Sequence, residues 1–389
     1  MSAEEAFITP AVLRWAREQA GYSIEEVANR VGVKPARVEA WETGTAKLTL
    51  GRLEMLAAIY KRPTAIFYLP APPRETFSKP ADFRDRHPGR MAPNLIYQIR
   101  HAEERREIAL ELMPEIGELQ PVKFSFACRR MDEPEHAGER LRHFLEVAWE
   151  TQKGWGRTDS SGYAALNGWK EATETAAVLV FQASKNQMGH ARGFSLHADV
   201  LPVVVLSSED VPVARCFTLL HELAHLGLHE GGICDLHDRG IERFCNEVAA
   251  AALMPKSELH AEMGALRSSK TASWTDGDIR RLAKAFSVSE QALVLRLCSV
   301  GAVSWEFYEH KRGEFEARNK QAKERKEPGF VPPHQMALAH NGTSFTRLVL
   351  EAYHQRCVTA HRASSYLGLS LEHFGKAEME VSRRWRRAS

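Results

Sequence analysis

The sequence has few cysteines, no long apolar run and almost no net charge. Six cysteines stand among 389 residues without a CxxC pair, so a disulfide framework is not indicated and a reducing, cytoplasmic location is expected. No apolar run approaches the about 20 residues of a membrane span, and the opening MSAEEAFITP lacks the apolar segment of a signal peptide. The net charge of +2 excludes a uniformly polybasic protein, so any DNA contact must come from a local patch.

The N-terminal part of the chain, residues 9–69, contains five short helical segments. Glycines stand where three of the segments end: Gly21, Gly32 and Gly44. Ser23 and Glu26 have the spacing of a capping box at the start of the second segment. Short helices joined by tight turns are typical of a helix-turn-helix domain, whose second helix enters the DNA major groove. The recognition helix is expected at 34–43.

The charge of this region is nearly balanced, with nine Lys or Arg and eight Asp or Glu in residues 1–70. Three residues that cannot bond bidentately to a base occupy the expected base-reading positions: Pro35, Ala36 and Ala40. Basic residues nearby are the candidate DNA contacts: Lys34, Arg37, Lys47 and Arg52, with Arg14 and Arg17 as further backbone contacts. Protein docking is the alternative role, and Trp15 and Trp41 fit an apolar core better than a stacking platform.

The rest of the chain mixes helices with three short strands. Apolar and β-branched runs predict the strands, the last of them central: 177–184, 193–196 and 201–208. Helical patterns follow at 92–118, 136–150, 161–176, 211–228, 239–254, 275–303 (two helices) and 344–370. The predicted fold class is therefore mixed and mostly α, with a five-helix N-terminal domain, an α+β domain around a small sheet and a small helical C-terminal domain.

The stretch FTLLHELAHLGLH contains a spacing typical of catalytic zinc. His221 and His225 are four residues apart, so on a helix both imidazoles lie within about 40° of each other and can reach one ion. Catalytic zinc keeps an open position beside such ligands. Glu222 projects to the adjacent side, where it can accept a proton from water. The plainer alternative is an amphipathic helix with a hydrogen-bonded histidine pair.

A third metal ligand must come from another element. Glu242, seventeen residues after His225, lies on the next predicted helix. Glu247 is its rival and lies about 140° further around that helix, so we do not expect both to bind one ion. Cys245 and Cys234 are weaker candidates, the second as a loop thiol that restrains activity.

The two segments FTLLHELAHLGLH and ERFCNEVAAAALMP resemble the ImmA/IrrE family of zinc metallopeptidases, and the likeness extends over residues 160–300. It implies zinc bound by His221, His225 and Glu242, with Glu222 as the general base of peptide hydrolysis. Cys245 departs from the family, which usually has alanine there. The stretch SIEEVANRVGVKPARVEAWETG resembles the XRE (Cro/CI-like) helix-turn-helix family, and LPAPPRETFSKPADFR resembles the joint between two such domains.

These resemblances predict a regulator that binds double-stranded DNA and cleaves a protein such as a repressor or antitoxin. The alternatives are a catalytically silent peptidase fold that senses a ligand or partner, and an antitoxin-like binding module. A homodimer is one expected state, and no membrane partner is expected. The predicted domains are a helix-turn-helix domain at 1–70, a connector at 71–91, a zincin-like metallopeptidase domain at 92–310, and a charged linker with helical domain at 311–389.

Three details of this peptidase are left open by the sequence. Several side chains are available to stabilise an anionic intermediate: His190, His197, His229, His237 and Tyr308. The strand at 201–208 or its neighbour is expected to pair with an extended substrate. The basic end RRWRR is a candidate contact for DNA or an acidic partner.

Overall fold

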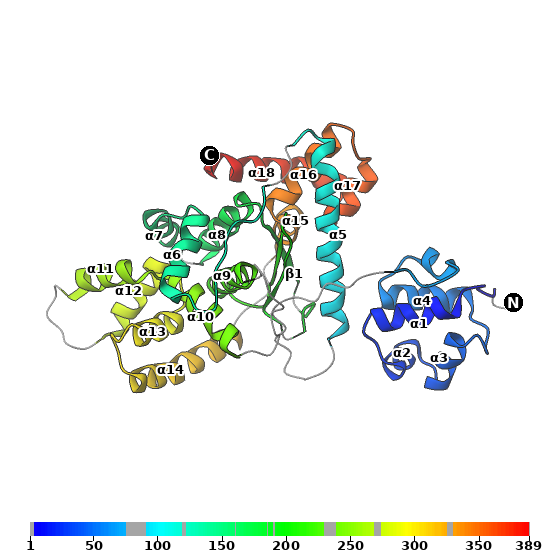
Figure 1. Cartoon of the computed structure of the whole chain (residues 1–389), viewed down its shortest axis with the longest axis horizontal. Helices are drawn as coiled ribbons and strands as arrows, with labels where there is room; N and C mark the ends of the chain where they lie inside the picture. The colour runs from blue at the N-terminus through cyan, green and yellow to red at the C-terminus, as the bar shows by residue number, and fades with distance from the viewer. Residues whose placement is uncertain are drawn as a thin grey trace. The chain divides into compact units, whose positions relative to one another are not determined.

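The structure is a computed structural model of the chain. It describes residues 4–74, 91–118, 122–159, 161–184, 186–189, 191–228, 239–267, 274–324 and 330–388. These residues form two compact units, one of the N-terminal helices together with residues 91–101 and 187–189, and the other of the sheet with the helices before and after it in the sequence (Figure 1). The fold is mostly helical with one small sheet, which confirms the predicted fold class. No described helix is both long and apolar enough to cross a membrane.

Five helical elements make up the N-terminal unit: α1 (Pro10–Gln19), α2 (Ile24–Val31), α3 (Pro35–Glu42), α4 (Leu50–Tyr60) and the 3-10 helix η1 (Thr64–Tyr68). Their ends follow the predicted signals. The Ser23 hydroxyl accepts from the Glu26 backbone N–H, and the Glu26 carboxylate accepts from the Ser23 backbone N–H, which completes the capping box. Gly32 ends α2 in the left-handed conformation, at φ 73°. The apolar faces meet in one core that includes Trp41.

A buried ion pair connects α1 to α3. The Arg17 guanidinium donates to Glu42 through Nε at 2.7 Å and Nη2 at 2.9 Å, and the two side chains are 10% and 2% exposed. The hydrogen bond to Glu42 raises the pKa of Arg17. The sequence offered Arg17 as a DNA backbone contact; this expectation is wrong, because the side chain is buried and occupied within the domain.

Replacing Glu42 by alanine should destabilise the N-terminal unit by about 3–5 kcal/mol, because Arg17 would keep a buried charge without its partner. Hydrogen exchange of the full-length protein, read by mass spectrometry on peptides from α1 and α3, measures the loss. Arg14→Ala is the matched control, since Arg14 Nε lies 3.9 Å from Glu42 and its side chain is 51% exposed. Equal loss of protection in both variants would contradict the buried-pair account.

Three strands form the sheet of the second unit: β1 (Leu179–Ala183), β2 (Gly193–Leu196) and β3 (Val203–Ser207). β3 is central, as the sequence predicted, and it is parallel to β1 and antiparallel to β2. Every strand residue is buried. Helix α8 (Tyr163–Thr175) packs against β1, and α9 (Pro212–Gly227) packs against β2 and β3. The sheet therefore supports α9, which carries the two predicted histidine ligands.

Eight further helices are described between residues 91 and 324. They are α5 (Pro93–Glu115), α6 (Pro134–Phe144), α7 (Trp149–Thr158), α10 (Arg239–Leu253), α11 (Lys256–Arg267), α12 (Asp276–Phe286), α13 (Glu290–Ser299) and α14 (Trp305–Glu324). The sequence did not predict α7 or α11. In α7, Gln152 donates to the carbonyls of Leu253 and Phe286, at 2.9 Å each, and a Cβ on Gly156 would meet the Lys284 carbonyl oxygen at 2.2 Å. Tertiary contacts thus hold a glycine-containing segment as a helix.

Helix α14 runs through the predicted domain boundary at 310 and through residues predicted as a linker. Tyr308 and Phe315 lie seven residues apart and bury one face of the helix in the core. The opposite face carries exposed polar pairs at helical spacing, such as His310 with Glu314 at 3.2 Å. The high charge of this segment therefore reflects the solvated side of a packed helix. The other domain boundaries stay predictions.

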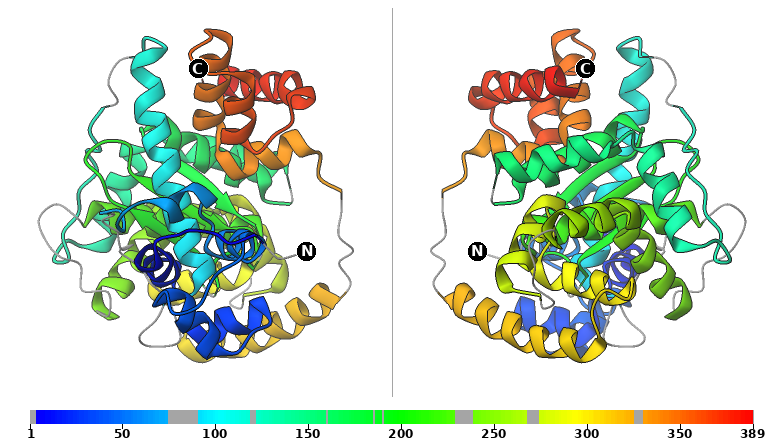
Figure 2. Two further views of the ribbon diagram at one scale, coloured as in Figure 1. Left: turned by 90° about the vertical axis from the view of Figure 1, so that its right-hand side faces the viewer. Right: turned by 90° about the vertical axis from the view of Figure 1, so that its left-hand side faces the viewer.

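The C-terminal helices form one group in both views of Figure 2. They are α15 (Pro333–Asn341), α16 (Thr343–His354), α17 (Ala360–Leu367), η2 (Leu371–His373) and α18 (Phe374–Ala388). Two side chains of α8 hold them. The Glu174 carboxylate accepts from the backbone N–H of Thr343 at 3.1 Å and of Ser344 at 3.2 Å, and Lys170 Nζ donates to the Ala339 carbonyl at 3.1 Å. Helix α8 therefore joins the end of α15 and the start of α16 to the sheet.

Candidate metal centre

Helix α9 lies inside the core. Pro212 occupies its first position, where a missing N–H has no cost. Every residue from 218 to 227 is buried, as is typical of a helix that is apolar on all sides. His221, Glu222 and His225 are 0%, 1% and 1% exposed. Polar side chains buried this deeply require partners, so their surroundings define the site.

Three predicted ligands meet at this helix. The Nε2 atoms of His221 and His225 are 3.1 Å apart. From the first turn of α10, Glu242 places Oε1 at 3.2 Å from His225 Nε2 and Oε2 at 3.7 Å from His221 Nε2. One ligand atom from each residue lies within 4.8 Å of the other two. The structure therefore brings the two imidazoles and the carboxylate to one point.

The spacing of these atoms fits a zinc ion. Nitrogen and oxygen ligands lie about 2.0–2.2 Å from Zn²⁺ in a tetrahedron, which puts neighbouring ligand atoms about 3.4 Å apart. The separations of 3.1, 3.2 and 3.7 Å lie around that value. Among the described residues, no other His, Cys, Asp or Glu belongs to the group. Three protein ligands and one further position are the composition of a catalytic zinc site.

The rival ligands are placed elsewhere. Glu247 is 44% exposed and accepts from Arg243 Nε at 2.8 Å. Cys245 is fully buried against His225; burial raises the pKa of this thiol, and a hydrogen bond to His225 opposes the rise. Burial also raises the pKa of Cys128 to about 12. Both thiols therefore act as small apolar core groups. Cys234 lies outside the described residues.

The predicted general base, Glu222 of α9, is hydrogen-bonded by a residue of strand β2. The Ser195 hydroxyl donates to Glu222 Oε2 at 2.9 Å, and Ser195 is 1% exposed. A Cβ on Gly193 would lie 2.6 Å from Thr218 Cγ2 and 3.2 Å from Glu222 Oε1, so glycine lets the strand approach α9. The sequence did not predict Ser195 as a site residue. The available signal was its position two residues after a glycine on a predicted strand, which puts both on one face.

The candidates for an oxyanion donor are dispersed. Three of them lie outside the described residues: His190, His229 and His237. His197 directly follows β2, and Tyr308 packs beside Trp305 in the helical core, with ring centroids 5.0 Å apart. Strand β3 is central, so the expectation that 201–208 itself pairs with a substrate is wrong; β2, its neighbour, has one strand partner among the described residues.

The candidate DNA contacts fall into two pairs. Lys34 and Arg37 are exposed at the start of α3. Lys47 Nζ donates to Glu5 at 2.5 Å, and Arg52 Nη1 donates to the last carbonyl of α2 at 2.5 Å. The second pair is therefore engaged within the domain, whereas the first pair faces solvent on the expected recognition helix. The connector 75–90 lies outside the described residues.

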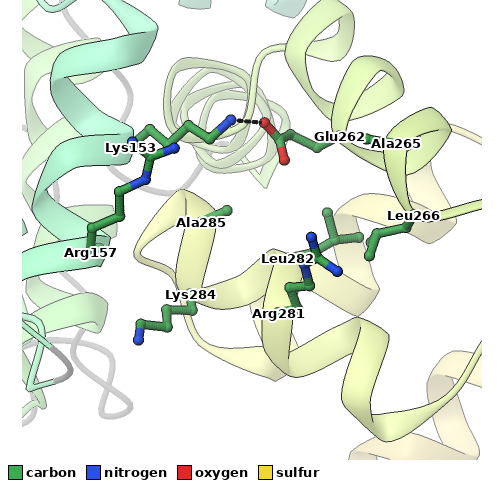
Figure 3. A pocket seen from close by; sticks show the side chains of 10 residues that line it. Lys153, Arg157, Glu262, Ala265, Leu266, Arg281, Leu282, Lys284 and Ala285 are labelled. Atoms are coloured by element: carbon green, nitrogen blue, oxygen red, sulfur yellow. Dashed lines mark hydrogen bonds and ion pairs between the residues drawn. The ribbon is translucent and has the colours of Figure 1, made fainter.

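A separate cavity of about 400 Å³ lies between α7, α11 and α12. Figure 3 shows Lys153 reaching across it to pair with Glu262. Arg157 and Lys284 are exposed at its rim. None of the three candidate metal ligands lines this cavity, so the metal centre is a distinct feature of the second unit.

Two family models match the chain. Residues 173–298 match the IrrE N-terminal-like domain of the M78 peptidases, and residues 13–67 match a helix-turn-helix family. No curated protein matches. Among solved structures, the chain is similar to a Mycobacterium tuberculosis transcriptional regulator at 17% identity, over 43% of this chain and 52% of that one, with a TM-score of 0.27; it thus spans about half of that protein. The chain therefore combines an N-terminal helix-turn-helix domain of the DNA-binding XRE type with an IrrE-like M78 peptidase domain.

Proposed function

We propose that this protein is a zinc-dependent endopeptidase that cleaves a partner protein, such as a repressor or antitoxin, and that it also binds double-stranded DNA. The convergence of His221, His225 and Glu242, with Glu222 one residue from the first histidine, carries this proposal. Two neutral imidazoles and a carboxylate form a ligand set of catalytic zinc sites. The family likeness over 173–298 supports the same reaction.

The residues around the ion would each have one task. A bound Zn²⁺ would supply Lewis acidity, which lowers the pKa of water and polarises a carbonyl. The Glu222 carboxylate would accept the proton of the attacking water and deliver it to the leaving amine. The Ser195 hydroxyl, 2.9 Å from Glu222 Oε2, would fix the orientation of that carboxylate. An extended peptide would add to the edge of β2, the strand that carries Ser195.

Cleavage is tested by comparing protein fragments in cells that express the wild-type chain or its Glu222→Gln variant. New N-termini in one protein, or a small number of proteins, should be present only with the wild type. The peptidase proposal fails if the two sets of N-termini are identical under conditions in which the wild type holds zinc. That result, with intact DNA binding, would favour the silent-regulator alternative.

The DNA-binding part of the proposal depends on α3. The Lys34→Ala/Arg37→Ala variant should bind a random-sequence duplex more weakly and lower the slope of log K against log salt by about 2, one for each lost phosphate contact. Fluorescence anisotropy over a salt series measures the slope. Lys47→Ala is the control, because Glu5 already holds that ammonium. An unchanged slope in the double variant would show that α3 does not contact phosphates.

A further inference from the structure

The C-terminal helices contain a helix of the same length and cap as α2. Both α17 and α2 have eight residues. Thr359 precedes α17 and its hydroxyl accepts from the backbone N–H three residues later, as Ser23 does before α2. In both places the helix ends at a glycine. The first helix of the N-terminal helix-turn-helix unit therefore has a counterpart near the other end of the chain.

The turn that follows is also repeated. Gly368 has φ 57° and ψ 36°, and Gly32 has φ 73° and ψ 43°. Two residues later the backbone is extended in both, at φ −67° and ψ 145° for Ser370 and at φ −74° and ψ 146° for Lys34. The next helix then begins, as η2 and α18 in one case and α3 in the other. The segment 359–388 thus repeats the order of helix, glycine turn and second helix found at α2 and α3, although α17 packs mainly against α16 whereas α2 packs against α3.

Burial follows the same order in the two units. Apolar residues one, six and nine positions after the glycine pack inward: Leu369, Phe374 and Ala377 in the C-terminal unit, and Val33, Val38 and Trp41 in the N-terminal one. The positions that face a DNA groove in such domains are exposed: Leu371, Glu372, Gly375 and Lys376 against Pro35, Ala36 and Glu39. The outer face of the second helix is therefore open in both units.

A similar turn joins α12 to α13, but there the second helix packs within the core. Ser287 is left-handed there, at φ 53° and ψ 43°. Seven residues later Val294 is buried in the core, where α13 packs against α12 and α14. The corresponding residue of the C-terminal unit is Gly375, which is exposed.

The C-terminal unit is basic. Residues 359–388 hold six Lys or Arg against three Glu, whereas residues 23–42 hold three against four. Each of the three carboxylates has a partner: Glu378 pairs with His354, Glu380 with two arginines, and Glu372 lies 3.6 Å from His373 while remaining exposed to solvent. Within the part of the chain that the structure describes, no carboxylate forms an ion pair with Arg362 or Lys376. The Arg362 guanidinium lies over the Tyr366 ring, 5.5 Å from its centroid. Exposed cations without a carboxylate partner favour a polyanion such as DNA.

We propose that α17 and the helix formed by η2 and α18 are a second contact with double-stranded DNA. Lys376 and Arg362 bind phosphates, and the first turn of the second helix enters the major groove. Glu372, four positions after the glycine, is placed to accept from a cytosine amino group. The chain then has two DNA-binding units, one on each side of the peptidase domain in the sequence, independently of whether the peptidase is active.

The test uses the full-length protein and a random-sequence DNA duplex of about 40 base pairs, long enough for several helical turns. The Arg362→Ala/Lys376→Ala variant should bind more weakly in fluorescence anisotropy and should lower the salt slope by about 2. Arg157→Ala/Lys284→Ala, which removes the same charge at the rim of the cavity in Figure 3, should leave the slope unchanged. Circular dichroism and sedimentation of each variant verify that folding and self-association are unaltered.

Three outcomes would overturn the proposal. The slope could be unchanged in the Arg362→Ala/Lys376→Ala variant. The cavity-rim variant could lower it equally, which would reduce the effect to net charge. The C-terminal variant could instead change self-association without changing DNA affinity, which would make the surface a protein interface. Combination with Lys34→Ala/Arg37→Ala should give the sum of the two slope changes, because the two units contact separate phosphates.

Discussion

Replacing Glu242 by alanine should reduce the zinc content from about one ion per chain to nearly none. The two buried imidazoles of His221 and His225 would remain, but the only anionic ligand in the group would be lost. The affinity should fall by more than the about 10–100-fold that the loss of an outer hydrogen-bond partner costs a zinc site. Elemental analysis after dialysis against a weak chelator measures the content, and His225→Ala should give the same result.

The matched control lies on the same helix. Glu247 is also a glutamate of α10, but its carboxylate is held by Arg243 at 2.8 Å. Glu247→Ala should therefore retain the metal and its affinity. If Glu247→Ala loses zinc while Glu242→Ala keeps it, the ligand set assigned here is wrong. Loss in both would point to a damaged helix rather than to a lost ligand, and circular dichroism would show it.

Replacing Glu222 by glutamine should keep the zinc and lower the rate of peptide cleavage by about 10²–10⁴-fold. The amide has the shape of the carboxylate and can still accept from Ser195, but it cannot take a proton from water. The measurement has two parts. Zinc content should equal that of the wild type, and affinity capture with the Glu222→Gln protein should recover an uncut partner that the wild type converts into fragments.

A second Glu→Gln change separates this effect from the loss of a negative charge. Glu262 pairs with Lys153 across the cavity in Figure 3 and has no part in the metal group. Glu262→Gln should cleave the captured partner at the wild-type rate. If Glu222→Gln cleaves the partner at the wild-type rate, Glu222 is not the general base. If neither the wild type nor any variant cleaves it with zinc bound, the peptidase fold acts as a sensor.

The features that the sequence predicted well depend on short-range signals. The capping box of Ser23 and Glu26, the glycine at the end of α2 and the three apolar strands each involve neighbouring residues, and all are present. The histidine pair is likewise a property of one helix turn. The third ligand was different, because helix geometry left Glu242 and Glu247 both open until the family resemblance favoured the first.

The features that the sequence did not predict depend on contacts between distant segments. Ser195 and Glu222 are 27 residues apart and meet because Gly193 lets β2 approach α9. Helix α7 contains two glycines and forms where Gln152 bonds to carbonyls more than 100 residues later. From the sequence, Arg17 resembles a surface residue that contacts the DNA backbone, and only the structure shows its buried partner Glu42. Local composition carries no information about such partners.

The two α8 side chains that hold the C-terminal helices have a practical consequence. Lys170 and Glu174 are shielded from water and form hydrogen bonds with the backbone groups of Ala339, Thr343 and Ser344 instead. A chain shortened before residue 330 would remove the partners of both side chains at once and would expose β1, against which α15 packs. The C-terminal helices are therefore integral to the second unit, and shortened versions of the protein are expected to precipitate.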